Sequence, residues 1–96
     1  MTDLELTEHG SFRELISQRG ITPQVFKSNL EAMEAVELMA TTCQLGDRVL
    51  ALGRKAQISE QRCRALLLDL VACFADPVQN ARRVLEIARE LRGYEK

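Results

Sequence analysis

Residues 63–74 read Cys-Arg-Ala-Leu-Leu-Leu-Asp-Leu-Val-Ala-Cys-Phe, and they form the most apolar stretch of the chain. After Arg64 the only polar side chain in this stretch is Asp69. A helix here would be apolar over much more than the roughly 100° stripe of a helix that packs on one neighbour. Ser59 is a suitable N-cap, and Pro77 disfavours the α conformation at the residue before it. The sequence therefore predicts a central helix that needs neighbours on at least two sides.

The one acidic side chain of this predicted helix has a simple structural interpretation. On a helical wheel, small and charged residues surround Asp69, and Leu67 lies opposite it. We interpret Asp69 as the centre of a narrow solvated stripe rather than as a catalytic carboxylate, because an unpaired Asp is rarely buried. Leu66 and Leu70 lie on one side of the core face and Leu68 on the other. These three leucines are the apolar area that a small chain has difficulty covering.

Composition indicates one soluble globular domain that spans residues 1–96. Of the 96 residues, 46% are hydrophobic and 28% are charged, which argues against disorder. The apolar stretches are too short to cross a bilayer, and the start of the chain lacks the basic region of a signal peptide. We therefore expect a cytoplasmic protein without membrane contact. Residues 1–10 are expected to form a short turn or a flexible arm.

The sequence offers little for catalysis or metal binding. His9 is the only histidine, and the three cysteines have no spacing typical of a metal site. We expect the cysteines to be reduced core residues, since an odd number, two of them within an apolar helix, does not suggest a disulfide framework. Glycine-rich phosphate loops are absent from the sequence. The prediction is a protein that is not an enzyme and needs no cofactor or metal.

Charge is distributed unevenly along the chain. Residues 1–44 carry seven acidic and three basic side chains, a net charge of −4, whereas residues 45–96 carry seven acidic and ten basic side chains, a net charge of +3. Oppositely charged halves are expected to contact each other or a second copy, or else a complementary partner. The overall net charge of −1 gives little support to nucleic-acid binding.

Two further helices are predicted before the central one. Ser11 and Glu14 match the capping box, and Gly20 fits the left-handed residue that follows a helix. Thr22-Pro23 is predicted to begin a long second helix. At Gly46 this helix either ends and restarts with Asp47 as the cap of a piece that continues to Gln57, or runs straight through. The cost of glycine in a helix interior favours the break or a bend. The apolar residues of the first helix are Phe12, Leu15 and Ile16. Those of the second are Val25, Phe26, Leu30, Met33, Val36, Met39, Ala40 and Cys43.

A final helix is predicted after the central one. Asp76 is the expected cap, Pro77 the first helical residue and Gly93 the end. The sequence thus predicts an all-α fold of four to five helices, packed as antiparallel hairpins in a small bundle or a hairpin stack. The expected apolar stripe of this helix consists of Val78, Ala81, Val84, Leu85, Ala88 and Leu91.

Two stretches resemble known helical motifs. Residues 12–33 have the outline of a helix-turn-helix, which implies that the second helix enters the DNA major groove, although Glu31, Glu34 and Glu37 would face phosphate there with the wrong sign. Residues 46–79 resemble one degenerate tetratricopeptide hairpin at Leu52-Gly53 and Asp76-Pro77. Such repeats bind peptides or helices in a concave groove. Asp69 stands where that repeat carries an aromatic residue, so the resemblance implies paired helices at most.

The predicted function is a non-enzymatic protein–protein interaction module, such as an adaptor, a small dedicated chaperone or an inhibitor of a partner. Its partner is another protein or further copies of the same chain. The alternative is a small helix-turn-helix regulator that binds DNA through residues 12–33. Three glutamates at a spacing of three in the long helix are interpreted as a solvated face rather than as a site. The candidate partner-binding residues are Met33, Met39, Leu66, Leu68 and Leu70.

Overall fold

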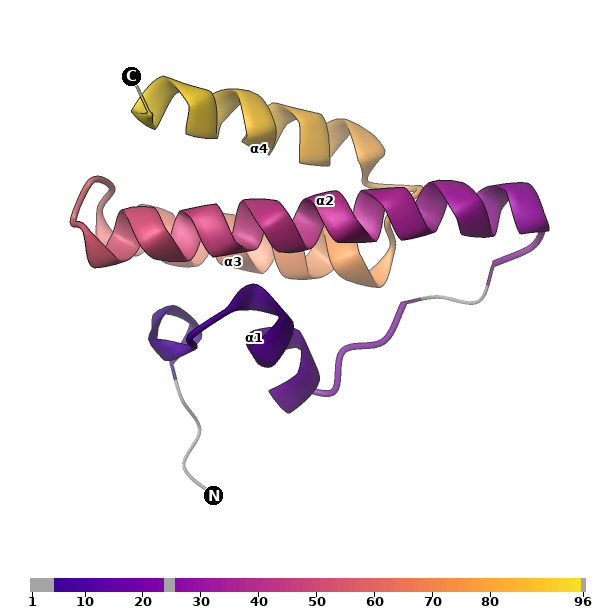
Figure 1. The fold of residues 1–96 in the computed structure, drawn as a ribbon, viewed down its shortest axis with the longest axis horizontal. Helices are drawn as coiled ribbons and strands as arrows, with labels where there is room; N and C mark the ends of the chain where they lie inside the picture. Colours follow the sequence, from indigo (N-terminus) through magenta and orange to yellow (C-terminus); the bar gives the residue numbers. More distant parts are fainter. Residues whose placement is uncertain (1–4, 24–25, 96) are drawn as a thin grey trace.

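The structure is a computed structural model that describes residues 5–23 and 26–95. In these residues it contains only helices, as predicted (Figure 1). They are a short 3-10 helix, η1 (Leu6–Glu8), and four α-helices: α1 (Phe12–Gln18), α2 (Asn29–Arg54), α3 (Glu60–Ala75) and α4 (Ala81–Tyr94). The molecule is flat, with principal extents of 41 × 38 × 16 Å.

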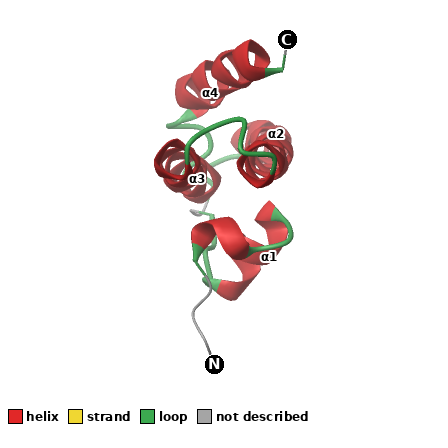
Figure 2. Cartoon of the chain, turned by 90° about the vertical axis from the view of Figure 1, so that its left-hand side faces the viewer, coloured by secondary structure: helices red, strands yellow, loops and turns green. Residues whose placement is uncertain are grey.

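The helices form three layers (Figure 2). α2 and α3 are an antiparallel pair in the middle layer, α4 covers one face of the pair, and α1 with η1 covers the other. Close approach within the pair requires a small residue, because a Cβ atom at Gly53 would lie 2.8 Å from the Cys63 Sγ atom. α3 therefore has neighbours on three sides, which satisfies its wide apolar surface.

The predicted boundaries of the central helix are confirmed in α3. The Ser59 hydroxyl accepts a hydrogen bond from the backbone N–H of Arg62, and the helix ends at Ala75, just before Asp76-Pro77. Leu66, Leu67, Leu70 and Cys73 have no exposed surface. The three cysteines are free and buried, as expected.

α2 is continuous through Gly46, so the favoured break is wrong and the alternative of an unbroken helix is confirmed. The reason lies in α1, whose Phe12 side chain packs directly on this glycine. A Cβ atom at Gly46 would lie 2.2–2.6 Å from Phe12 carbon atoms, which is too close for any side chain. Asp47 does not cap a new helix. Its carboxylate accepts a hydrogen bond from the Phe12 backbone N–H at 2.8 Å and so serves the first turn of α1.

α2 also begins later than predicted. Thr22 and Pro23 lie outside any helix, and the N-cap is Ser28, whose hydroxyl accepts a hydrogen bond from the Glu31 N–H. Val25 lies outside the described residues. Ser28 and Glu31 form the same cap signature that was found at Ser11 and Glu14, and the Ser11 hydroxyl likewise accepts from the Glu14 N–H.

Other predicted helix ends need smaller corrections. α2 ends at Arg54 rather than Gln57, and Ala56 adopts a left-handed conformation (φ 56°) in the turn that follows. α4 begins after Asn80, because residues 77–80 form a turn in which the Asn80 N–H donates to the Asp76 carbonyl. It continues past Gly93 to Tyr94. Gly20 has the predicted left-handed conformation (φ 63°) after α1.

Candidate functional site

The first three turns of α2 project beyond the rest of the bundle (Figure 1). α2 has 26 residues and α3 has 16, so at 1.5 Å per residue α2 is about 15 Å longer than the helix it pairs with. The Ser28 cap and the Glu31 carboxylate, which accepts from the Lys27 N–H at 3.4 Å, hold the start of this segment. The projection is therefore a regular helix with a free side.

Three large apolar side chains lie on the free side of this segment, and we call Leu30, Met33 and Val36 the α2 stripe. Their exposed fractions are 69%, 68% and 63%. Ala35, on the opposite side of the helix, is fully buried. The helix is thus anchored along one side while three apolar side chains face outward. Three exposed large apolar side chains on successive turns are a feature of interaction surfaces rather than of scattered surface residues.

The α2 stripe continues into a groove between α1, α2 and α3. The groove has a volume of about 240 Å³. Val36 belongs to both the stripe and the groove, and the half-buried Met39 and Phe74 supply two of the larger apolar walls. The lining residues are Arg13, Val36, Met39, Ala40, Cys43 and Phe74. An apolar side chain from another molecule could enter here.

The five predicted partner-binding residues do not lie together. Met33 lies on the α2 stripe and Met39 lines the adjoining groove, whereas Leu68, 55% exposed, is on the outer side of α3. The prediction is wrong for Leu66 and Leu70, because both are fully buried in the core of this chain. The surplus apolar surface was assigned to α3, but the layers on both faces of the pair cover α3 and leave α2 partly uncovered.

Leu30 and Val36 were missed as surface residues because their spacing is that of an ordinary core face. The signal that identifies them is helix length, since a helix longer than its partners must leave some of its apolar side uncovered. That comparison required a continuous α2, and the break predicted at Gly46 concealed it. On α4, Leu85 is similarly 59% exposed, and Ile87 takes the buried position instead.

The acidic side chains beside the stripe are available for contacts. Glu34 and Glu37 are exposed, and within residues 5–23 and 26–95 neither carboxylate forms a hydrogen bond or an ion pair. They line a shallow hollow together with Leu38 and Thr41, on the solvent edge of the stripe. The predicted solvated face is therefore present at Glu34 and Glu37, beside the apolar stripe, whereas Glu31 is half-buried and accepts a hydrogen bond from the Lys27 N–H.

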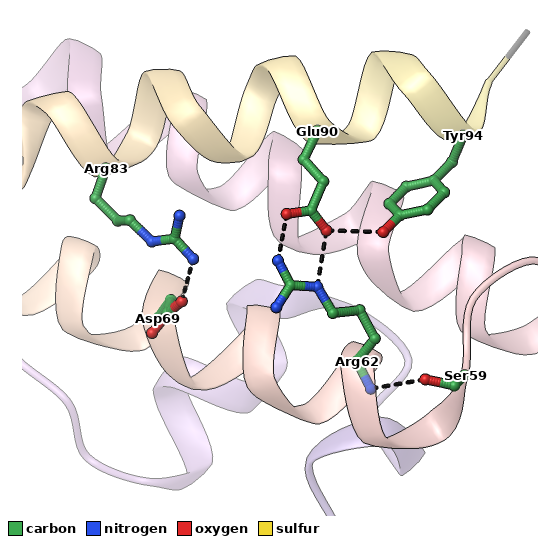
Figure 3. A network of polar contacts seen from close by, with 6 residues as sticks. All are labelled: Ser59, Arg62, Asp69, Arg83, Glu90 and Tyr94. Atoms are coloured by element: carbon green, nitrogen blue, oxygen red, sulfur yellow. Dashed lines mark hydrogen bonds and ion pairs between the residues drawn. The ribbon is translucent and has the colours of Figure 1, made fainter.

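A network of polar contacts joins α3 to α4 and links the two helices structurally (Figure 3). Arg62 forms a bidentate ion pair with Glu90, and the Tyr94 hydroxyl donates to the same carboxylate at 2.9 Å. The Arg62 guanidinium lowers the pKa of Glu90, and Tyr94 adds to this effect. Asp69 accepts from Arg83. The predicted solvated stripe on α3 thus lies under α4 as a row of interhelical contacts.

Charge pairing inside the chain leaves much of the predicted asymmetry in place. Glu5 pairs with Arg64 across the two halves. Among the described residues of the basic second half, ion pairs join Arg48 to Glu95, Arg62 to Glu90 and Arg83 to Asp69. Glu34 and Glu37 of α2 take part in none of these pairs, and both are exposed to solvent.

The single histidine lies in a different setting from the one expected. His9 was expected in a mobile arm, but it is 3% exposed, and neither ring nitrogen has a hydrogen-bond partner there. No group of three or more His, Cys, Asp or Glu side chains among the described residues could hold a metal ion. None of the helices in these residues is both long and apolar enough to cross a membrane.

Comparisons of the chain with protein-family models, with curated proteins and with solved structures found no significant match. The geometry of the α2 stripe and its groove is therefore the basis for the function proposed below.

Proposed function

We propose that this chain is a non-enzymatic protein–protein interaction module that binds its partner through the α2 stripe and the adjoining groove. The observation that carries the proposal is the exposure of Leu30, Met33 and Val36 on a capped helix that projects from the bundle. Burying each of these side chains would contribute about 1.5–3 kcal/mol before the costs of association. An adaptor, a small chaperone or an inhibitor could each use such a surface.

The fold supports this proposal more than it supports the DNA-binding alternative. A helix-turn-helix requires a short turn between its two helices. Here α1 ends at Gln18 and α2 begins at Asn29, so residues 19–28 separate them. The start of α2 carries Glu31, Glu34 and Glu37, which would repel the phosphate backbone.

The test is site-specific photo-crosslinking in the native cell. A photoreactive amino acid is placed at Met33, at Val36 and, as a control, at Gln61, which is exposed on α3. We expect a discrete protein adduct from the two α2 positions and none from Gln61. Equal crosslinking from all three positions would contradict the proposal. Binding of the purified chain to duplex DNA with a steep salt dependence would contradict it as well.

A further inference from the structure

We propose that the molecule bound at the α2 stripe is an amphipathic helix of another protein, with basic side chains along one edge of its apolar face. This inference rests on the proposed function and adds the chemical class of the partner. It is carried by the length of the apolar surface, by the groove at its end and by the two glutamates beside it.

The surface has the dimensions of a helix-binding site. From Leu30 to Cys43 the stripe and the groove extend along α2 over thirteen residues, or about 20 Å, and the surface winds around the helix from its free side to the groove beside α1 and α3. A partner helix of about four turns matches this length. Helix-in-groove recognition uses apolar anchors at spacings of three and four, and the stripe presents complementary side chains at a spacing of three. The groove beside Met39 and Phe74 can receive one large anchor.

The two glutamates beside the stripe determine which edge of the partner helix should carry basic side chains. Glu34 and Glu37 are one turn apart on the solvent edge, and their carboxylates form no ion pair with a described residue. Lysine or arginine side chains at the same spacing on a partner would meet both. Arg13 lines the groove at the α1 side. The basic edge of the partner is therefore confined to the part that faces Glu34 and Glu37.

The same charges disfavour a second copy of this chain as the occupant. An antiparallel pair of α2 stripes related by a two-fold axis would place the glutamate edges of both copies next to each other. A parallel pair would align the positive ends of the two helix dipoles at Ser28. A basic helix avoids both repulsions.

The experiment uses the full chain and four designed peptides of about 16 residues. Three share one apolar leucine stripe and carry lysine, glutamine or glutamate along its edge, and the fourth has the composition of the lysine peptide without the stripe. Affinities are measured by fluorescence anisotropy. We expect the lysine peptide to bind about tenfold more tightly than the glutamine peptide, and the glutamate peptide to bind least. This preference should shrink as salt is raised.

Two double variants assign the preference to residues. Glu34→Gln with Glu37→Gln should lower the affinity for the lysine peptide to that for the glutamine peptide. The matched control is Glu60→Gln with Glu86→Gln, which changes net charge equally at exposed positions elsewhere and should leave the preference intact. Circular dichroism confirms that both variants are folded. Met33→Ser should weaken binding of every peptide that carries the apolar stripe.

The outcomes separate this inference from the proposed function. Equal affinity for lysine and glutamine peptides, with both lost in Met33→Ser, overturns the basic partner but keeps the interaction surface. A dimer of the chain alone that Met33→Ser dissociates also overturns it, because a second copy would then cover the stripe. Failure of all four peptides to bind overturns the helical partner, and the crosslinking at Met33 and Val36 then decides the proposed function independently.

Discussion

The carboxylate of Asp47 accepts a hydrogen bond from the backbone N–H of Phe12 across 2.8 Å, although 35 residues separate the two in sequence. Phe12 is the first residue of α1, where backbone N–H groups have no partner within the helix. Its side chain lies on Gly46, the residue before Asp47. Gly46 of α2 thus leaves room for the Phe12 ring, and the next residue, Asp47, caps the first turn of α1.

Removal of the Asp47 carboxylate is expected to destabilise the attachment of α1. Asp47→Ala leaves the Phe12 N–H without its acceptor and should lower the free energy of unfolding by about 1 kcal/mol, since the residue is exposed and water can partly replace it. Asp47→Asn keeps an acceptor oxygen and should lose less. Urea unfolding of both variants gives the difference. An equal loss in both would show that charge, rather than the hydrogen bond, stabilises this contact.

Gly46→Ala is expected to destabilise the protein even though alanine is the better helix former. The new Cβ atom would overlap the Phe12 ring, and the resulting displacement of α1 should cost about 1–3 kcal/mol. Gly93→Ala is the matched control, because Gly93 lies in α4 with nothing within 4 Å of its added Cβ atom. That variant should gain up to about 1 kcal/mol. Opposite signs in urea unfolding confirm the prediction.

Ala56→Gly is expected to stabilise the turn between α2 and α3. Ala56 has φ 56°, a left-handed conformation that strains an L-residue by about 1–2 kcal/mol. Glycine removes this strain but loses more conformational entropy on folding, so the expected net gain is about 0.5–1 kcal/mol. Ala72→Gly, at an exposed position within α3, should instead lose about 1 kcal/mol. Thermal unfolding of the two variants tests the contrast.

The Arg62–Glu90 pair is expected to make stability depend on acid pH. Arg62 lowers the pKa of Glu90 below its ordinary value of 4.5, so the folded state binds this proton less readily than the unfolded state. The contribution is present above pH 4.5 and is lost as pH falls through the lowered pKa. Arg62 is 40% exposed, so solvent screening limits the effect to about 0.5 kcal/mol.

Glu90→Gln tests this assignment. The variant should be less stable at pH 7, and its unfolding free energy should fall less steeply between pH 5 and pH 3. Some dependence should remain, because the Arg48 guanidinium also lowers the pKa of Glu95. Urea titrations across this range supply the measurement, and parallel curves for the two proteins would refute the role of Glu90.

The cysteine thiols are expected to report opening of the core. Cys43, Cys63 and Cys73 are at most 5% exposed, and burial raises the pKa of Cys73 to about 11, with a smaller contribution from Asp69. A protonated and buried thiol reacts slowly with a disulfide reagent at neutral pH. The rate of thiol labelling should therefore be low without urea and should rise with urea concentration in parallel with the unfolded fraction. Fast labelling of one cysteine without urea would reveal local opening of its helix.

Local signals in the sequence predicted the elements well where they depend on neighbouring residues. The cap at Ser59, the stop before Pro77, the left-handed Gly20 and the Ser11 cap are all present in the structure. Gly46 was misjudged because a distant contact, the packing of Phe12, overrides the local signal. The errors in helix starts have a different cause, since two local start signals lie close together. Thr22-Pro23 and Asp76-Pro77 both carry start signals, yet the helices begin at later caps, Ser28 and Asn80.

The candidate site was predicted only in part, because which helix is covered depends on the packing of the whole chain. Met33 and Met39 were predicted as partner-binding residues, and they lie on the α2 stripe and in the adjoining groove. The sequence did not show that Leu66 and Leu70 are buried and Met33 is exposed, because apolar residues have the same spacing on a covered helix and on an uncovered one.

The amino-acid sequence by itself determined that the chain is helical, where the central helix begins and ends, and that its cysteines are core residues, because caps, prolines and apolar periodicity act over a few residues. Only the tertiary structure decided that α2 runs unbroken through Gly46 and that its first turns remain uncovered. The unbroken helix depends on Phe12, which fills the space beside Gly46 that a side chain would need. The uncovered turns depend on α2 being longer than α3. Contacts between distant segments and relative helix lengths are properties of the packed molecule.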